Sequence, residues 1–189
     1  VSDSQDEVHA NAAMEALLGQ AMENEWVSDA ALSSSLSQFQ ALWALREDIS
    51  EAQGAEGKTI KHDIALPISR IAEFIDHTSA AIASQFEGVR LVVFGHLGDG
   101  NLHFNLSPAA DRLGAEHSAA FVALEGPLNR LVHDAVATCG GSISAEHGLG
   151  VLRRDESARY KAPLELALMR AIKQALDPLN LMNPGKTLV

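Results

Sequence analysis

The chain has 189 residues, a formal net charge of −11 and 47% hydrophobic residues. This length accommodates a domain with a real core, and the negative charge argues against binding to nucleic acid or to an anionic membrane surface. No stretch approaches the roughly eighteen consecutive apolar residues of a membrane span, so an integral membrane protein is not expected. The single cysteine, Cys139, excludes an internal disulfide and fits a reducing compartment, which favours a cytoplasmic location.

The N-terminus opens on Val-Ser-Asp-Ser without an initiator methionine, and no basic region followed by an apolar block is present. We therefore expect a fragment of a longer protein, without a signal peptide.

Two helices are predicted at the front of the chain, over residues 7–24 and 29–53. In the second helix, residues on one side recur at intervals of three or four: Leu32, Leu36, Phe39, Trp43, Arg46 and Ser50. Arg46 and Ser50 therefore extend an apolar stripe with a guanidinium and a hydroxyl group. The alternative is that Arg46 simply reaches from the helix end into solvent.

Residues 59–66 are predicted to form a strand. Alternation places Lys61, Asp63 and Ala65 on one face and a mainly apolar set on the other. A lysine in a strand is ordinarily a solvated or edge residue, so Lys61 carries little information by itself. A helix with a clean apolar face follows, from Pro67 to about residue 88.

A β-hairpin is predicted around Asp99-Gly100, because this dipeptide favours a two-residue type I′ turn. Such a turn places His96 directly opposite His103, with Asn105 pointing the same way. Two imidazoles at a cross-strand separation of about 5 Å can share a metal ion. The alternative is that both histidines are partly buried residues that only form hydrogen bonds.

A second polar stretch, residues 142–150, is predicted to be a short strand ending in Glu146-His147 between glycine-rich turns. Two histidines and one carboxylate with an open fourth position form a recurrent catalytic zinc set. Because adjacent strand residues face opposite sides, we expect one of Glu146 and His147 to bind the metal and the other to accept a proton.

The rest of the chain predicts helices over about 116–124, 128–139 and 163–176, an exposed charged connection at 153–160, and a turn at 183–186. The order of elements favours a single domain, residues 1–189, of the α+β class. Its largely antiparallel sheet carries helices on one face and polar residues on the other. No dinucleotide fingerprint, Walker loop or nucleophile elbow is present, so no nucleotide site of its own is expected.

Five stretches of this chain resemble, in order, the C-terminal domain of the FAD-linked oxidases, the group of D-lactate dehydrogenase, the glycolate oxidase flavin subunit and D-2-hydroxyglutarate dehydrogenase. They are Leu42-Trp43-x-x-Arg46-Glu47, Lys61-His62-Asp63-Ile64-x-Leu66-Pro67, His96-x-Gly-Asp-Gly-Asn-x-His103, Ser144-Ala-Glu-His-Gly-x-Gly150 and Asn183-Pro-Gly-Lys186.

The resemblance implies a cap domain that supplies the substrate and metal site of an FAD-dependent D-2-hydroxyacid dehydrogenase, while the FAD-binding domain would precede residue 1. It implies FAD and a divalent metal, zinc, as cofactors. The residues that it assigns are His96, His103 and Glu146 to the metal, Arg46, Ser50 and Lys61 to the substrate carboxylate, Asn105 to substrate positioning, His147 to the base, and Asn183 and Lys186 to the cofactor. Position 50 is serine where the D-2-hydroxyglutarate branch has threonine, which keeps the hydroxyl group.

The reaction implied by this resemblance oxidises a 2-hydroxy acid to a 2-oxo acid by hydride transfer to the flavin. An electron acceptor protein or a quinone would then take the electrons, and a homodimer is considered. The alternatives are a zinc-dependent hydrolase, in which the same ligands activate water, and a non-catalytic binding domain. A hydrolase leaves Arg46 and Lys61 without a role.

Overall fold

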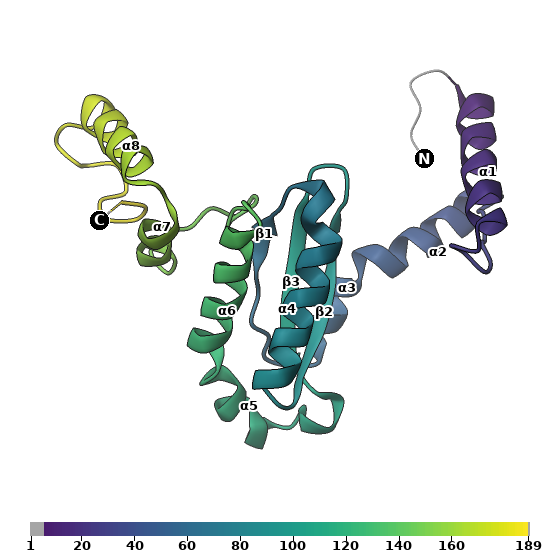
Figure 1. Cartoon of the computed structure of the whole chain (residues 1–189), viewed down its shortest axis with the longest axis horizontal. Coiled ribbons are helices and arrows are strands. Elements are labelled where there is room, and N and C mark those ends of the chain that lie inside the picture. Colours follow the sequence, from purple (N-terminus) through teal and green to yellow (C-terminus); the bar gives the residue numbers. More distant parts are fainter. Residues whose placement is uncertain (1–5, 189) are drawn as a thin grey trace. The chain divides into compact units, whose positions relative to one another are not determined.

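The computed structural model describes residues 6–188, which fall into two compact units, one ending at Glu51 and the other beginning at Ala52 (Figure 1). The first unit contains helices α1 (Glu7–Glu23) and α2 (Leu36–Glu47). Both begin at a capping side chain: Asp6 accepts a hydrogen bond from the N–H of His9, and Ser35 accepts one from the N–H of Gln38.

The helix expected over residues 29–53 is shorter and divided. It begins only after Ser35, because a serine stabilises a helix as its cap better than as an interior residue. It ends with Asp48 as the C-cap, and a separate helix α3 (Ile49–Ala55) follows.

The second unit is built on a three-stranded antiparallel sheet in the order β1-β3-β2, which confirms the α+β class. The strands are β1 (Asp63–Ala65), β2 (Val89–His96) and β3 (Asn101–Pro108). Strand β1 is shorter than the predicted strand over 59–66, although Ile60 still forms a bridge with Leu106. The sheet therefore exists as expected, with a short edge strand.

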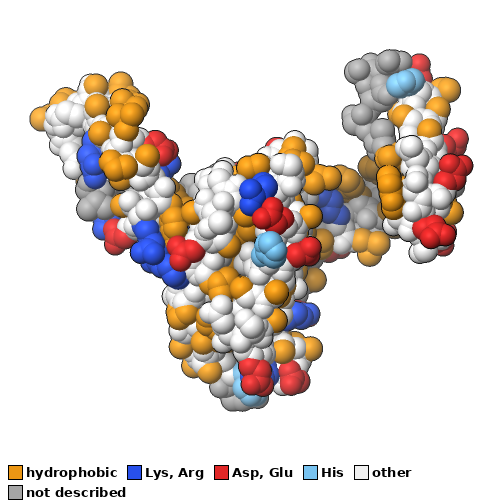
Figure 2. Space-filling model, in the orientation of Figure 1, with side chains coloured by type: hydrophobic (Ala, Val, Ile, Leu, Met, Phe, Trp, Pro, Cys, Tyr) orange, Lys and Arg blue, Asp and Glu red, His pale blue; other side chains and the backbone are white. Residues whose placement is uncertain are grey.

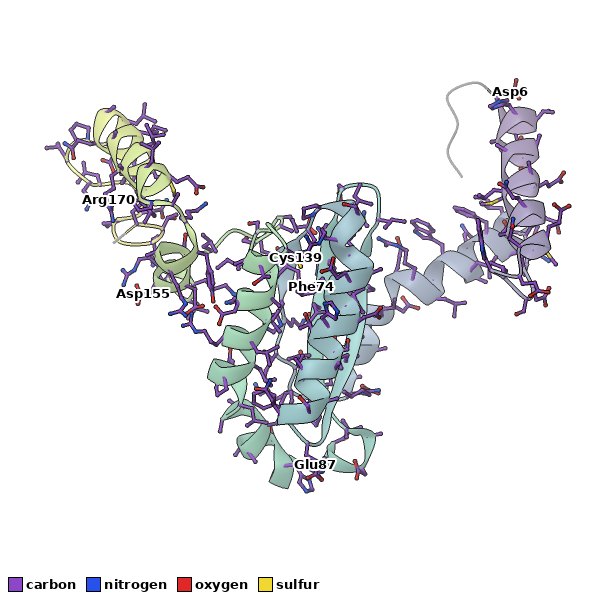
Figure 3. The ribbon with its side chains drawn as sticks, viewed as in Figure 1. Asp6, Phe74, Glu87, Cys139, Asp155 and Arg170 are labelled. Atoms are coloured by element: carbon purple, nitrogen blue, oxygen red, sulfur yellow. The ribbon has the colours of Figure 1, made fainter. Side chains whose placement is uncertain are left out.

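One face of the sheet carries the core. The 3-10 turn Ile68–Arg70 leads into α4 (Ile71–Gln85), which crosses the sheet in Figure 1, and α6 (Glu125–Thr138) lies beside α4. Phe74 of α4 (Figure 3) meets Phe104 of β3 edge to face, with ring centroids 5.2 Å apart. The other buried apolar residues are Ile60, Ile64, Leu66, Ile82, Leu102, Leu106, Phe121, Leu128, Val132, Val136 and Ile143.

Two local predictions are wrong. Residues 142–150 form a loop joined to β1 by one bridge, between Ala65 and Ser142, because Gly148 and Gly150 turn the chain with φ values of 73° and 58°. The charged connection is a helix, α7 (Arg154–Tyr160), which forms ion pairs rather than an apolar stripe. The two helices predicted over about 116–124 and 128–139 are separate, as expected, but the break lies at residues 123–124, and Gly126-Pro127 falls in the first turn of α6, where proline is tolerated.

The remaining elements are the 3-10 turn Ala110–Arg112, α5 (Ala115–Val122) and α8 (Pro163–Leu176). Helix α8 matches its prediction and begins with a proline in its first turn. Its surface is rich in hydrophobic side chains, as Figure 2 shows, and Leu164, Leu168, Ile172 and Leu176 are all exposed. Among residues 6–188, no helix is both long enough and apolar enough to cross a membrane.

Gly100 gives a first test of this fold. Its φ is +78°, and a Cβ atom added there would lie 2.1 Å from the carbonyl oxygen of Leu66. We expect Gly100→Ala to lower the free energy of unfolding by about 2 kcal/mol or more, since strain and a backbone clash combine. Gly98→Ala is the control, because nothing lies within 4 Å of its added Cβ atom. Urea unfolding of both variants measures the difference, and equal stability would contradict the close approach of Gly100 to Leu66.

Two buried histidines give a second test. His62 and His133 are buried on the core side of the sheet, where their rings meet edge to face with centroids 5.5 Å apart. Burial lowers the pKa of His62 to about 3, and burial also lowers the pKa of His133. Both are therefore neutral in the folded protein at neutral pH. The unfolded chain takes up these protons near pH 6.5, so stability is complete above that value and declines as the pH falls below it, by up to about 1.4 kcal/mol per pH unit for each group. For His62 this decline continues to about pH 3.

His62→Asn removes one of these groups, while its amide nitrogen can still donate where His62 Nδ1 meets the Phe104 carbonyl oxygen. Between pH 7 and pH 5 we expect the unfolding free energy of the variant to fall by about 2 kcal/mol less than that of the wild type. Parallel urea titrations at the two pH values measure this. Identical losses in both proteins would show that His62 is not held neutral by the fold.

Candidate active site

The face of the sheet opposite the core carries a row of polar side chains. In the strand register, Asp63 of β1 lies directly opposite His103 of β3, and Asn101 and Asn105 share this face by alternation. Phe94 of β2 lies on the other side of His103, with the two rings 4.9 Å apart. The predicted alternation of residues 61–65 is thus confirmed, and it brings Asp63 to the histidine.

The predicted register of the hairpin is wrong. His96 pairs with Asn101, not with His103, because residues 97–100 all belong to the connection. The Gly100 N–H bonds to the His96 carbonyl oxygen at 3.1 Å, and the Gly100 carbonyl oxygen accepts from Leu66 N at 3.0 Å. This tertiary bond anchors the turn. His96 is therefore a diagonal neighbour of His103 on the same face, a spacing of roughly 7–8 Å that long side chains still bridge.

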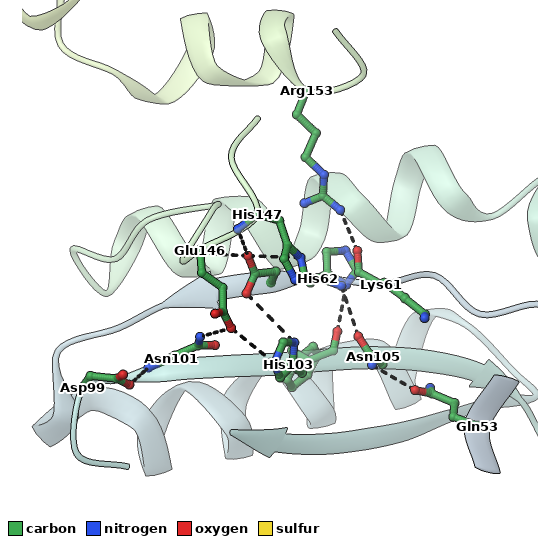
Figure 4. A network of polar contacts seen from close by, with 12 residues as sticks. Gln53, Lys61, His62, Asp99, Asn101, His103, Asn105, Glu146, His147 and Arg153 are labelled. Carbon is green, nitrogen blue, oxygen red and sulfur yellow. Dashed lines mark hydrogen bonds and ion pairs between the residues drawn. The ribbon is translucent and has the colours of Figure 1, made fainter. Parts of the chain in front are cut away.

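The Glu146-His147 loop is fastened along β1 through its backbone. Ala65 and Ser142 exchange two hydrogen bonds of 3.0 and 2.8 Å, and Ala145 N donates to the Asp63 carbonyl oxygen at 3.0 Å. The Asp63 carboxylate completes the attachment, because its Oδ2 accepts the N–H groups of both Glu146 and His147, at 3.0 and 2.9 Å (Figure 4).

This attachment brings ionisable side chains together above His103. The Nε2 atom of His103 lies 3.8 Å from Glu146 Oε1, and its Nδ1 atom lies 4.0 Å from Asp63 Oδ1. His147 Nδ1 is 3.4 Å from Asp63 Oδ2. The predicted separation of Glu146 and His147 to opposite sides is wrong, because in this loop both side chains reach the same cluster.

The cluster offers ligands of the type that bind a divalent ion. Ligand atoms of Asp63, Glu146 and His147 all lie within 4.8 Å of one another. Two ligand atoms on one tetrahedral zinc ion are about 3.3 Å apart when the bonds are about 2.0–2.1 Å, so the 3.8 Å between His103 and Glu146 is near that spacing. Nitrogen and carboxylate oxygen are also the usual ligand atoms of zinc in proteins. The residues therefore fit a metal ion.

Asn101 and Asp63 shape the charge of this cluster. The Asn101 Nδ2 atom donates to Glu146 Oε1 at 2.7 Å and so orients that carboxylate. Burial by itself would raise the pKa of Asp63, but the N–H groups of His147 and Glu146 outweigh it and hold the pKa of this carboxyl below its usual value. Asp63 is thus an anion beside two imidazoles.

The predicted substrate residues have different surroundings. The Lys61 side chain is exposed. The backbone carbonyl oxygen of Lys61 accepts from Arg153 Nη2 at 2.6 Å. Asn105 is only 4% exposed; its Nδ2 donates to Gln53 Oε1 at 2.9 Å and its Oδ1 accepts from His62 N at 3.3 Å.

The remaining predicted residues lie at the two ends of the chain. Arg46 of α2 places its guanidinium 5.2 Å from the ring centroid of Trp43, and Ser50 is exposed on α3. Both stay predictions as substrate ligands. Asn183 and Lys186 form the predicted turn, in which Lys186 N donates to the Asn183 carbonyl oxygen at 3.2 Å. They line a pocket of about 940 Å³ between α8 and the C-terminal tail.

Sequence reasoning missed Asp63 as a site residue. The available signal was the alternation of the 59–66 stretch, which placed this carboxylate on the polar face with Lys61. Asn101 was missed as well, because only the true register of the hairpin brings it to Glu146.

Comparison with known proteins identifies the family of this chain. The family model for the C-terminal domain of FAD linked oxidases matches residues 1–187. A D-2-hydroxyglutarate dehydrogenase of Xanthomonas citri is 41% identical over 182 residues, which cover 96% of this chain and 37% of that protein. A D-2-hydroxyglutarate dehydrogenase of Stutzerimonas stutzeri is 36% identical over 165 residues, which cover 87% of this chain and 34% of that protein. The mitochondrial D-2-hydroxyglutarate dehydrogenase of Bos taurus is 38% identical over 172 residues, which cover 90% of this chain and 29% of that protein.

The chain therefore belongs to the FAD-linked oxidases, as their C-terminal domain. It spans about one third of the length of the curated relatives that it matches.

Proposed function

We propose that this chain is the substrate- and metal-binding part of an FAD-dependent dehydrogenase that oxidises a D-2-hydroxy acid to the 2-oxo acid. The observation that carries the proposal is the convergence of His103 and Glu146, 3.8 Å apart, beside His147, in a chain of this family. The relatives named above as D-2-hydroxyglutarate dehydrogenases make a dicarboxylic 2-hydroxy acid the first substrate to test.

We propose His96, His103 and Glu146 as the residues that hold a divalent metal, with zinc the first choice. Glu146 and His103 face one another, and His96 approaches from the diagonal position on the same sheet face. A bound zinc ion would supply Lewis acidity at the substrate hydroxyl oxygen. Asn101 keeps the Glu146 carboxylate turned toward this point through its 2.7 Å hydrogen bond.

His147 is the residue that we propose to take the proton from the substrate hydroxyl group. Its side chain is 68% exposed, so it is accessible to a small molecule that enters beside the loop. Asp63 Oδ2 lies 3.4 Å from His147 Nδ1 and can hold that nitrogen, which leaves Nε2 of the ring for the proton. Such general-base assistance is typically worth about 10²–10⁴-fold in rate.

Lys61, Arg46 and Ser50 are proposed to bind the substrate carboxylate. Lys61 lies two residues before Asp63, just outside β1, and its exposed side chain supplies a positive charge for a carboxylate. The amide oxygen of Asn105 accepts from His62 N, and one of its amide hydrogens is donated to Gln53 Oε1. It therefore has one amide hydrogen with which to position the substrate.

FAD, when bound, would accept the hydride from the substrate carbon. We place its site mainly on a part of the longer protein outside this chain, with Asn183 and Lys186 reaching toward it from the C-terminal tail. An electron acceptor protein or a quinone, a homodimer and a cytoplasmic location stay predictions.

The metal set is tested by zinc content. We expect the chain to bind close to one zinc ion per molecule, and His103→Ala and Glu146→Gln each to lower the affinity at least tenfold, because each removes a ligand. His77→Ala, on the exposed surface of α4, is the matched control and should bind like the wild type. Competition with a chromophoric chelator measures the affinities. Zinc below a tenth of a mole per mole in the wild type would reject the metal site.

The base is tested in the longer protein loaded with FAD. His147→Ala should lower kcat for a D-2-hydroxy acid by about 10²–10⁴-fold and leave the zinc content unchanged. Elemental analysis and steady-state kinetics provide the two readings. A parallel loss of zinc would instead make His147 a ligand together with Asp63 and Glu146, the three residues whose ligand atoms lie within 4.8 Å of one another.

A further inference from the structure

We propose that Asp63 is a positioning residue for the metal site: its carboxylate holds the Glu146-His147 loop with one oxygen and orients His103 with the other. This inference rests on the function proposed above, because it takes His103 and Glu146 as metal ligands. It concerns a residue that contacts both ligand-bearing segments.

The first oxygen acts as a backbone clamp. Asp63 Oδ2 accepts from Glu146 N at 3.0 Å and from His147 N at 2.9 Å. Two consecutive N–H groups converging on one carboxylate oxygen fix the direction of the chain at that point, since each charge-assisted bond is stronger than a neutral one. The Glu146 side chain therefore leaves the loop toward β3, where it meets His103 and Asn101.

The second oxygen is available for His103. Asp63 is only 8% exposed, and its Oδ1 atom is buried without a hydrogen-bond partner among residues 6–188. A buried carboxylate oxygen that lacks a donor is costly. The ring of His103 stands directly across the strand pair, with Nδ1 at 4.0 Å from this oxygen. We infer that the Nδ1–H group of His103 turns to this oxygen when the site is assembled, because histidine at a metal site ordinarily donates its second nitrogen to such a group.

This contact selects the tautomer that a ligand needs. With the proton on Nδ1, facing Asp63, the lone pair of Nε2 points toward Glu146 Oε1, 3.8 Å away. With the proton on Nε2, the same ring offers no ligand atom there. Asp63 thus controls whether His103 can act as a ligand, although it lies on the Nδ1 side of the ring, away from the metal.

Asp63→Asn makes the idea testable, because the two backbone N–H groups require an oxygen at the position of Oδ2. The amide oxygen must take that position, so the NH₂ group faces His103 Nδ1. The ring then accepts at Nδ1 and carries its proton on Nε2. We expect Asp63→Asn to weaken zinc binding by about 10–100-fold while the loop keeps its attachment.

Asp177→Asn is the matched control. Asp177 is also a buried carboxylate that accepts two consecutive N–H groups, those of Leu181 and Met182, both at 2.8 Å. Among the described contacts it faces a lysine, Lys173, and no histidine. The control removes a similar clamp elsewhere in the chain, and we expect it to leave zinc affinity unchanged.

The experiment uses the whole 189-residue chain. Zinc affinity is measured by chelator competition for the wild type and both variants. Nitrogen-15 NMR of the metal-free chain reports which ring nitrogen of His103 is protonated, with His103→Gln to assign the signal. We expect the proton on Nδ1 in the wild type and in Asp177→Asn, and on Nε2 in Asp63→Asn.

The outcomes separate this inference from the proposed function. A wild type that binds no zinc overturns the metal site and this inference together. Normal zinc binding by the wild type, with an equal affinity for Asp63→Asn, overturns the inference alone. A bare Nδ1 in the wild type overturns it without reference to any variant, so the test does not depend on the folding of Asp63→Asn. A loss of a thousandfold or more with an unchanged tautomer also overturns it, since Asp63 would then be a direct ligand.

Discussion

The candidate site depends on one interaction, the acceptance of the Glu146 and His147 backbone N–H groups by the Asp63 carboxylate. Among the described residues, the backbone of the loop that carries these residues joins the sheet at the Ala65–Ser142 bridge and at the bond from Ala145 N to the Asp63 carbonyl oxygen, and its glycines favour many conformations. Asp63 joins this loop to the strand pair that bears His103. Residues separated by forty or more positions in the sequence therefore converge on one point.

The residue before Asp63, His62, anchors this part of the chain to the core. The His62 Nδ1 atom lies 2.8 Å from the Phe104 carbonyl oxygen, and its ring packs against that of His133. Arg153 links the chain before Asp63 to helix α6, since it donates to the Lys61 carbonyl oxygen and lies 3.3 Å from His133 Nε2. The positions of the neutral His62 on the core side and the ionised Asp63 on the polar side thus follow from the alternation of consecutive residues in extended chain, while His133 comes from α6.

Much of the fold was accessible from the sequence. Helices α1 and α8 follow from capping residues, proline and apolar spacing, and the hairpin was placed by its Asp-Gly turn. The register of that hairpin was not accessible, because it is fixed by a tertiary hydrogen bond between Leu66 and Gly100. Helix α7 was missed because its sequence is charged and has no apolar stripe; in the structure its Glu156 pairs with Arg130 of α6.

The sequence predicted which residues lie in the site better than it predicted how they are arranged. His103 does lie beside Glu146 and His147, as the motifs indicated, but Glu146 and His147 lie in a loop rather than in the predicted strand. The contribution of Asp63 needed the long-range contact between β1 and residues 145–147, which no local pattern encodes.

Anomalous X-ray scattering at the zinc absorption edge, from crystals of this chain grown with zinc, tests the central claim most directly. The account predicts one strong peak within about 2.0–2.2 Å of both His103 Nε2 and a carboxylate oxygen of Glu146. A peak bonded to other side chains, or no peak beside these two at full zinc loading, would contradict it.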